Sequence, residues 1–205
     1  KSAPRNSDYP NRSLVCRENT ANRGDGTYYP QEQIDRIVKM AKSKECAVHM
    51  DGARLFNAVI ASGVEPSRMV RDCDTISICI SKGLGAPVGG VLVGSKEVID
   101  QAHRWRKMFG GGMRQAGVLA AAGLYALDHH VDRLGEDHVR ARQLAEGLDG
   151  INGIILNVNS VQTNMVYLKT EDLAENVVKS LAADSIDVLA IGSHLVRLVT
   201  HLHID

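Results

Sequence analysis

Short apolar runs alternate with helical stretches in the first part of this 205-residue chain. Residues 31–43 place apolar side chains at helical spacing, whereas residues 46–50 and 75–80 have the length and composition of strands. A further helix is predicted between these strands and is expected to end at Gly63, a residue type that readily closes a helix. This alternation predicts an α/β fold, with a mostly parallel, doubly wound sheet flanked by helices.

The pattern changes beyond residues 150–153, which are bounded by glycines. One helix is predicted there, at residues 172–182, among three short strands. The strands are expected at residues 154–158, 163–168 and 196–202. We therefore predict two domains: residues 1–148 form part of a large α/β domain, and residues 149–205 form a small C-terminal α+β domain.

The composition excludes two classes of partner. The chain has 24 basic and 24 acidic residues, so it lacks the basic excess that is typical of a nucleic-acid-binding surface. No apolar run approaches the roughly 18 residues that span a bilayer. The candidates at residues 76–80 and 88–93 are short, and they are predicted as buried strands. We therefore expect neither a nucleic-acid partner nor a membrane partner.

The cysteines favour a reducing compartment. Cys16, Cys46, Cys73 and Cys79 show no C-x-x-C spacing, and at least two of them lie inside apolar runs. This pattern fits the cytoplasm and gives no support for a metal site. The first residues include neither an initiating methionine nor an apolar targeting segment, so we expect the sequence to begin inside a longer protein. A mitochondrial location therefore stays open.

Two polar residues follow predicted strands at the places where ligands bind in open α/β sheets. Asp51 follows residues 46–50 and Lys82 follows residues 75–80, and ligands of such folds lie beyond the carboxyl ends of the strands. A lysine after an apolar strand can have its charged form disfavoured, which suits bond formation with a carbonyl group. A carboxylate at the neighbouring strand end can keep a pyridinium nitrogen protonated. A lone lysine is more often a surface residue at a turn, and Asp51 is equally well interpreted as the cap of the following helix.

Five sequence blocks carry a more specific signal. They are Glu18-Asn19-Thr20, His49 to Ala58, Ser81 to Gly89, Gly110 to Gln115 and Arg197 to His201. In this order and spacing they resemble successive motifs of the low-specificity threonine aldolases. The resemblance covers nearly the whole chain, as the central and C-terminal part of that family. It implies a fold-type-I, transferase-like enzyme that uses pyridoxal 5'-phosphate and cleaves 3-hydroxy-amino acids, such as threonine and allo-threonine, to glycine and an aldehyde.

The resemblance also implies roles for individual residues. Lys82 would bind the cofactor covalently, and Asp51 would pair with the ring nitrogen of the cofactor. Arg54 and Arg197 would hold the carboxylate of the substrate, for which the planar guanidinium group is well suited. Arg197 lies within the apolar run 195–199, so an inward, paired arginine is at least as plausible as a charge at a strand edge. No metal is implied.

The basic residues around Gly110 to Gly112 have two interpretations. Glycines that directly precede a helix would expose backbone amides at its positive end, where a phosphate can bind. The resemblance implies that Lys107 and Arg114 act near the phosphate of the cofactor across a subunit interface, in a homodimer or homotetramer. Without the resemblance, a flexible connection between helices with solvated basic residues would be preferred.

The chain departs from the family in two respects. The N-terminal third of the family, with its phosphate loop and a histidine that stacks on the cofactor, lies upstream of the residues present here. Moreover, Asp8 and Ala21 stand where the family usually has histidines. We therefore expect weak or lost aldolase activity, because the proton of the substrate hydroxyl group needs a base. A catalytically inactive relic of the fold and another fold-type-I lyase or aminotransferase are the alternatives.

Overall fold

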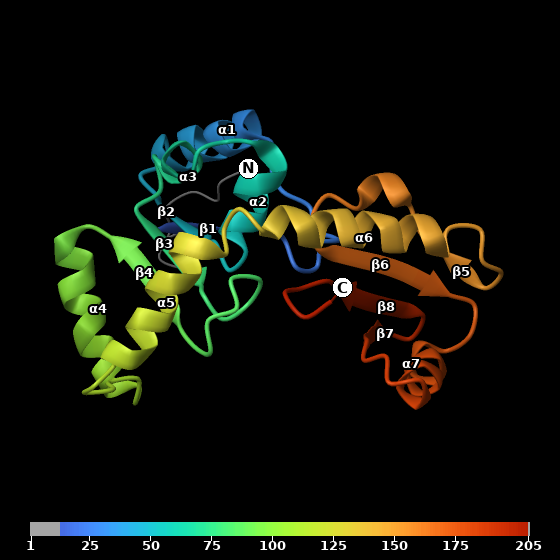
Figure 1. Cartoon of the computed structure of the whole chain (residues 1–205). Coiled ribbons are helices and arrows are strands. Elements are labelled where there is room, and N and C mark those ends of the chain that lie inside the picture. Colours follow the sequence, from blue (N-terminus) through green and yellow to red (C-terminus); the bar gives the residue numbers. More distant parts are fainter. Residues whose placement is uncertain (1–12, 205) are drawn as a thin grey trace.

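The structure, a computed structural model, describes residues 13–204 and contains two separate β-sheets (Figure 1). The helices are α1 (Gln31–Lys42), α2 (Leu55–Ser62), α3 (Pro66–Val70), α4 (Lys96–Met108), α5 (Gly117–His129), α6 (Leu134–Leu148) and α7 (Ala174–Ala183). The strands are β1 (Leu14–Glu18), β2 (Ala47–Asp51), β3 (Thr75–Cys79), β4 (Gly90–Gly94), β5 (Ile154–Ile155), β6 (Met165–Thr170), β7 (Leu189–Gly192) and β8 (Leu195–Val199). Within these residues, no helix is both long and apolar enough to cross a membrane.

The first sheet has the strand order β1-β2-β3-β4, in which β1, β2 and β3 run parallel. Successive side chains of β2 point to opposite faces of the sheet, and Val48 and Met50 are buried on one of these faces. Helices α1, α2 and α3 cover this face, and α1 contributes Ile34 and Val38, which are four residues apart and lie on one side of the helix. The predicted α/β fold with a mostly parallel sheet is confirmed.

Strand β4 differs from the prediction. It runs antiparallel to β3, and Val91, Leu92 and Val93 are 42–44% exposed, so the prediction of a buried strand at residues 88–93 is wrong. In the described part of the chain β4 is one of the two edge strands of the sheet, and its side chains therefore have strand neighbours on one side only.

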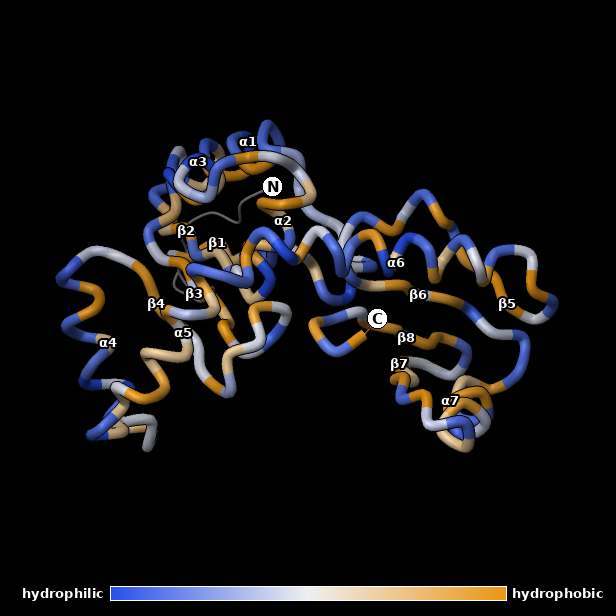
Figure 2. Tube along the Cα trace, in the orientation of Figure 1, coloured by the Kyte–Doolittle hydropathy of each residue, from blue (hydrophilic) through white to orange (hydrophobic). Residues whose placement is uncertain are grey.

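The second sheet is antiparallel throughout, in the order β5-β6-β8-β7. Val166 and Leu168 of β6 pack with α6 and α7 on one face, and Figure 2 shows the apolar character of β6 and β8. Successive strand residues point to opposite faces, so Tyr167 of β6 and its cross-strand partner Arg197 of β8 lie on the other face. Of the elements in this part, β7 was not predicted, and β8 ends at Val199, three residues before the predicted end.

Helix α6 connects the two sheets. Residues 130–133 separate it from α5. The first residue of α6, Leu134, is fully buried and packs with residues that follow β3, whereas Ala141 and Ala145 pack against β6. Because one rigid helix contributes to both cores, it holds the sheets together, although it precedes the domain boundary predicted at residues 148–149.

The segment of residues 19–27, called the β1–α1 loop below, forms a second connection between the sheets. Thr163 donates a hydrogen bond from Oγ1 to the carbonyl oxygen of Gly26 over 2.7 Å, and the side-chain oxygen of Gln162 accepts one from the amide of Tyr28. Gly26 is buried in the left-handed conformation, with φ of 69°. A Cβ atom at this position would lie 2.9 Å from Cβ of Met165, so only glycine allows this close approach.

We predict that Gly26→Ala destabilises the protein more than Gly63→Ala. Both glycines have left-handed φ angles, 69° and 68°, which cost a residue with a side chain about 1–2 kcal/mol. A Cβ at Gly63 meets nothing within 4 Å, whereas at Gly26 it collides with β6, which adds about 1–3 kcal/mol of overpacking. Urea unfolding of the two variants measures the difference. Equal losses of stability would show that the β1–α1 loop is not packed as described.

Candidate active site

The carboxyl ends of three strands form one edge of the first sheet. The register aligns Glu18 of β1 with Asp51 of β2, and Asp51 with Ser77 of β3. Asp51 is exposed, and its Oδ1 accepts a hydrogen bond from the amide of Ala53 over 3.0 Å. The N-cap of α2 is Arg54, so Asp51 supports the turn before the helix and is not its cap residue. This edge is where ligands bind in open α/β sheets.

Lys82 lies on a well-anchored loop just beyond β3. Its carbonyl oxygen accepts a hydrogen bond from the amide of Gly85, and Ile80 and Leu84 on either side of it are buried. The ring Nδ1 of His130 lies 2.6 Å from the carbonyl oxygen of Leu84 and fixes the far side of the loop. Lys82 itself is exposed, and its ammonium group has no hydrogen-bond or ion-pair partner among residues 13–204. The loop therefore presents a free amine on a rigid support.

Arg197 is held from the β1–α1 loop. Its Nη1 donates a hydrogen bond to Oδ1 of Asn22 over 2.6 Å. The hydroxyl of Tyr167 donates to the backbone carbonyl of the same asparagine. The Nε atom of Arg197 is buried and has no hydrogen-bond partner in the part of the chain that the structure describes. The prediction of a paired, inward-facing arginine therefore fits this environment.

Arg54 and Arg197 form a group of positive charges. Burial lowers the pKa of Arg54, and the nearby charge of Arg197 lowers it further. Burial raises the pKa of Tyr167, whereas the adjacent guanidinium group of Arg197 lowers it. Within residues 13–204, neither arginine forms an ion pair with a carboxylate. Partly buried charges of the same sign are costly, so this group favours an anionic ligand.

Lys107 and Arg114 are not brought to this group by the described chain. Both are exposed and lie at the connection between α4 and α5. Figure 1 shows this connection at the far ends of the two helices, away from the first sheet. The expected helix start directly after Gly112 is wrong, because α5 begins at Gly117. The amides of Gly110 and Gly111 instead donate to carbonyl oxygens in the last turn of α4. The glycines thus close the preceding helix. The phosphate role of the two basic residues stays a prediction.

Asn22 and Tyr167 are the residues of this group that the sequence did not indicate. The alternation of β6 and β8 would have placed Tyr167 beside Arg197 once the two strands were paired correctly. No local signal identifies Asn22, because its contact with Arg197 joins positions 175 residues apart. Ala21, which precedes Asn22, belongs to the same loop, whereas Asp8 lies outside the described residues.

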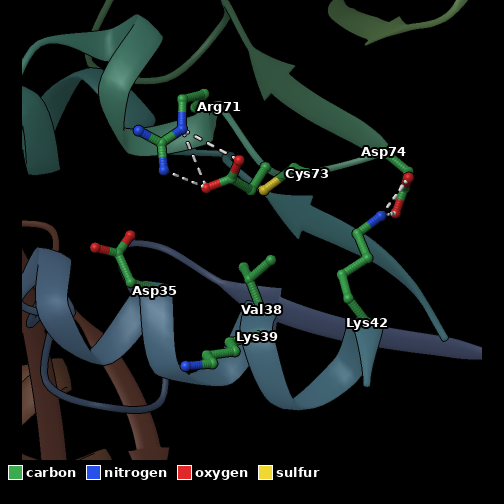
Figure 3. A pocket seen from close by; sticks show the side chains of 8 residues that line it. Asp35, Val38, Lys39, Lys42, Arg71, Cys73 and Asp74 are labelled. Atoms are coloured by element: carbon green, nitrogen blue, oxygen red, sulfur yellow. Dashed lines mark hydrogen bonds and ion pairs between the residues drawn. The ribbon is translucent and has the colours of Figure 1, made fainter. Parts of the chain in front are cut away.

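A surface pocket of about 570 Å³ lies elsewhere, between α1 and the segment after α3 (Figure 3). Two ion pairs line it: Lys42 with Asp74 over 2.6 Å and Arg71 with Asp72 over 2.7 Å. None of the predicted site residues lines it. Across residues 13–204, no group of three or more His, Cys, Asp or Glu side chains is arranged to hold a metal ion. We interpret the pocket as a solvated surface, and the strand-end group as the candidate site.

Comparison with known proteins shows the family of the chain. A family model described as beta-eliminating lyase matches residues 2–171. The chain belongs to the beta-eliminating lyase family. Low-specificity L-threonine aldolase 1 of Arabidopsis thaliana is 44% identical over 197 residues, which cover 94% of this chain and 55% of that protein. Low specificity L-threonine aldolase of Escherichia coli K12 is 44% identical over 193 residues, or 94% and 56%. The chain thus spans about half the length of these curated relatives.

A solved structure has the same fold as this chain. The threonine aldolase of Leishmania major superimposes with a TM-score of 0.80 at 23% identity, over 98% of this chain and 59% of that chain. The expected fold-type-I architecture is confirmed, as is the resemblance to the threonine aldolases that the five sequence blocks indicated.

We predict that the carboxyl group of Asp35, which lines the surface pocket, titrates at a pKa of about 2. The hydrogen bond from Arg68 is the main cause, and a second comes from Gln31. Since the folded pKa lies below the ordinary value of 3.8, the pair contributes stability above pH 4, and this contribution is lost as the pH falls toward 2. Carbon NMR titration of wild type and Arg68→Met measures the effect. An unchanged Asp35 pKa in the variant would contradict the assignment.

Proposed function

We propose that the protein to which this chain belongs is a pyridoxal-phosphate-dependent threonine aldolase that cleaves threonine or allo-threonine to glycine and acetaldehyde. The observation that carries the proposal is the pair of arginines, Arg54 and Arg197, which has no carboxylate partner in the described chain and lies near the strand ends. The names of the relatives support the reaction class.

The residues present fit the cofactor. Lys82 offers a free amine on an anchored loop, and Asp51 offers an exposed carboxylate on the neighbouring strand. Lys82 would hold the cofactor covalently, and Asp51 would keep its ring nitrogen protonated. Lys107 and Arg114 would bind its phosphate from a neighbouring subunit of a homodimer or homotetramer. When bound, the cofactor supplies an electron acceptor for the bond that breaks.

The arginines would determine how the substrate is oriented. Arg54 and Arg197 bind the carboxylate of the 3-hydroxy-amino acid and so fix one end of the molecule. Their half-buried surroundings strengthen this interaction by keeping water away. Cleavage also requires a base to remove the proton of the β-hydroxyl group. Ala21 supplies none, so slow turnover is part of the proposal.

The cofactor lysine provides the direct test. After addition of pyridoxal phosphate to the full-length protein and reduction with borohydride, peptide mapping should find the pyridoxyl label on Lys82. Lys82→Ala should abolish the visible absorption band, whereas Lys96→Ala, an exposed lysine paired with Asp100, should not. A label on Lys44, Lys96 or Lys107, or no absorption band at all, would contradict the proposal. Absence of the absorption band would favour the alternative that the protein is an inactive relic of the fold.

We also predict that Ala21→His raises aldolase turnover while cofactor binding changes little. A general base contributes typically about 10² to 10⁴-fold in rate, so restoring an imidazole should recover part of that factor. Ala21→Phe is the matched control, because it adds a ring without a titratable nitrogen. Allo-threonine cleavage, measured as acetaldehyde release, gives the comparison. High turnover in the natural protein, or equal rates in the two variants, would show that the missing base has been misplaced.

A further inference from the structure

The guanidinium group of Arg197 has one nitrogen bonded to Asn22 and one buried nitrogen without a partner. Its Nη1 donates to Oδ1 of Asn22 over 2.6 Å, which is a short, charge-assisted hydrogen bond. Its Nε is buried and has no partner among the residues described. A buried donor without a partner is costly, so it is expected to have a ligand in the working protein.

The edge that carries the unpartnered Nε has the shape that a carboxylate requires. In arginine, the N–H bond of Nε and one N–H bond of Nη2 point in the same direction and form a planar fork. This fork matches the two oxygens of a carboxylate in a bidentate interaction. Because Nη1 is bonded to Asn22 and Nε lacks a partner, the edge formed by Nε and Nη2 is the one whose hydrogen bonding a carboxylate would complete.

Asn22 is itself fixed from the second sheet. The hydroxyl of Tyr167 donates to the backbone carbonyl of Asn22, and Tyr167 is the cross-strand partner of Arg197. The three residues therefore form a closed arrangement between the β1–α1 loop, β6 and β8. Rotation of the guanidinium group would break a hydrogen bond to a residue that cannot follow it.

We infer that Asn22, supported by Tyr167, is a positioning residue that sets which edge of Arg197 faces the substrate and so makes the site selective for a planar carboxylate. This inference rests on the proposed function, in which Arg197 binds the amino acid. Asn22 acts through the arginine and does not need to touch the reacting atoms.

The test compares glycine with glycinamide, which has a neutral amide of similar size in place of the carboxylate. Both are titrated into the full-length protein loaded with pyridoxal phosphate, and the change in cofactor absorbance reports binding. The natural protein should prefer glycine. Asn22→Ala should reduce this preference about tenfold, since a hydrogen bond to a charged group is lost and the fork is no longer fixed. Tyr167→Phe should reduce it less.

Gln162→Ala is the matched control. It removes the side-chain acceptor for the amide of Tyr28, just beyond the β1–α1 loop, without touching Arg197. The glycine preference should therefore stay within twofold of the natural value. If Asn22→Ala and Tyr167→Phe both keep the natural preference while Arg197→Leu abolishes it, the inference is wrong and the proposed function stands. Equal losses in Gln162→Ala and Asn22→Ala would likewise overturn it, because loop anchoring alone would then explain them. A natural protein that binds neither compound would instead refute the proposed function.

Discussion

The close contact between Gly26 and β6 is the constraint on which the candidate site depends. A side chain at Gly26 would collide with Met165, so the β1–α1 loop approaches the second sheet only because this residue is glycine. The same approach brings Asn22 within hydrogen-bond distance of Arg197. Two sheets that are far apart in the sequence thereby contribute to one group of side chains. Packing between the sheets is thus a precondition for the binding geometry.

The electrostatics of this group are better explained by function than by stability. Burial disfavours the charge of Arg54, and a second arginine nearby disfavours it further. By contrast, the fully buried carboxylate of Asp137 is paired with Arg133, with 2.7 Å between Nη2 and Oδ1. Unpaired, partly buried charges reduce the stability of the folded chain. Such an arrangement is typical of a binding site, because an anion that binds there stabilises the charges. Perturbed ionisation and missing partners therefore coincide at the strand ends.

Local sequence patterns were sufficient for the large features and for two site residues. Local patterns predicted β2, α2 and β3, although α3 was missed, and strand-end position alone singled out Asp51 and Lys82. Arg54 and Arg197 needed the resemblance to a family, because nothing local distinguishes Arg54 from a surface charge and the apolar run around Arg197 gives no chemical role. Asn22 and Tyr167 were missed since their roles arise from pairing across 145 or more residues. The exposure of β4 was also missed, because an apolar run does not reveal whether its strand lies at the edge of a sheet.

The central claim is that the two sheets together form a carboxylate site beside the cofactor lysine. A crystal structure of the full-length protein with pyridoxal phosphate and glycine tests it most directly. The account predicts that the cofactor is bonded to Nζ of Lys82, or that glycine has displaced Lys82 from the cofactor. It also predicts that the glycine carboxylate lies on the Nε and Nη2 edge of Arg197, with Asn22 still bound to Nη1. A carboxylate bound away from Arg197, or a cofactor bound to another lysine, would contradict the account.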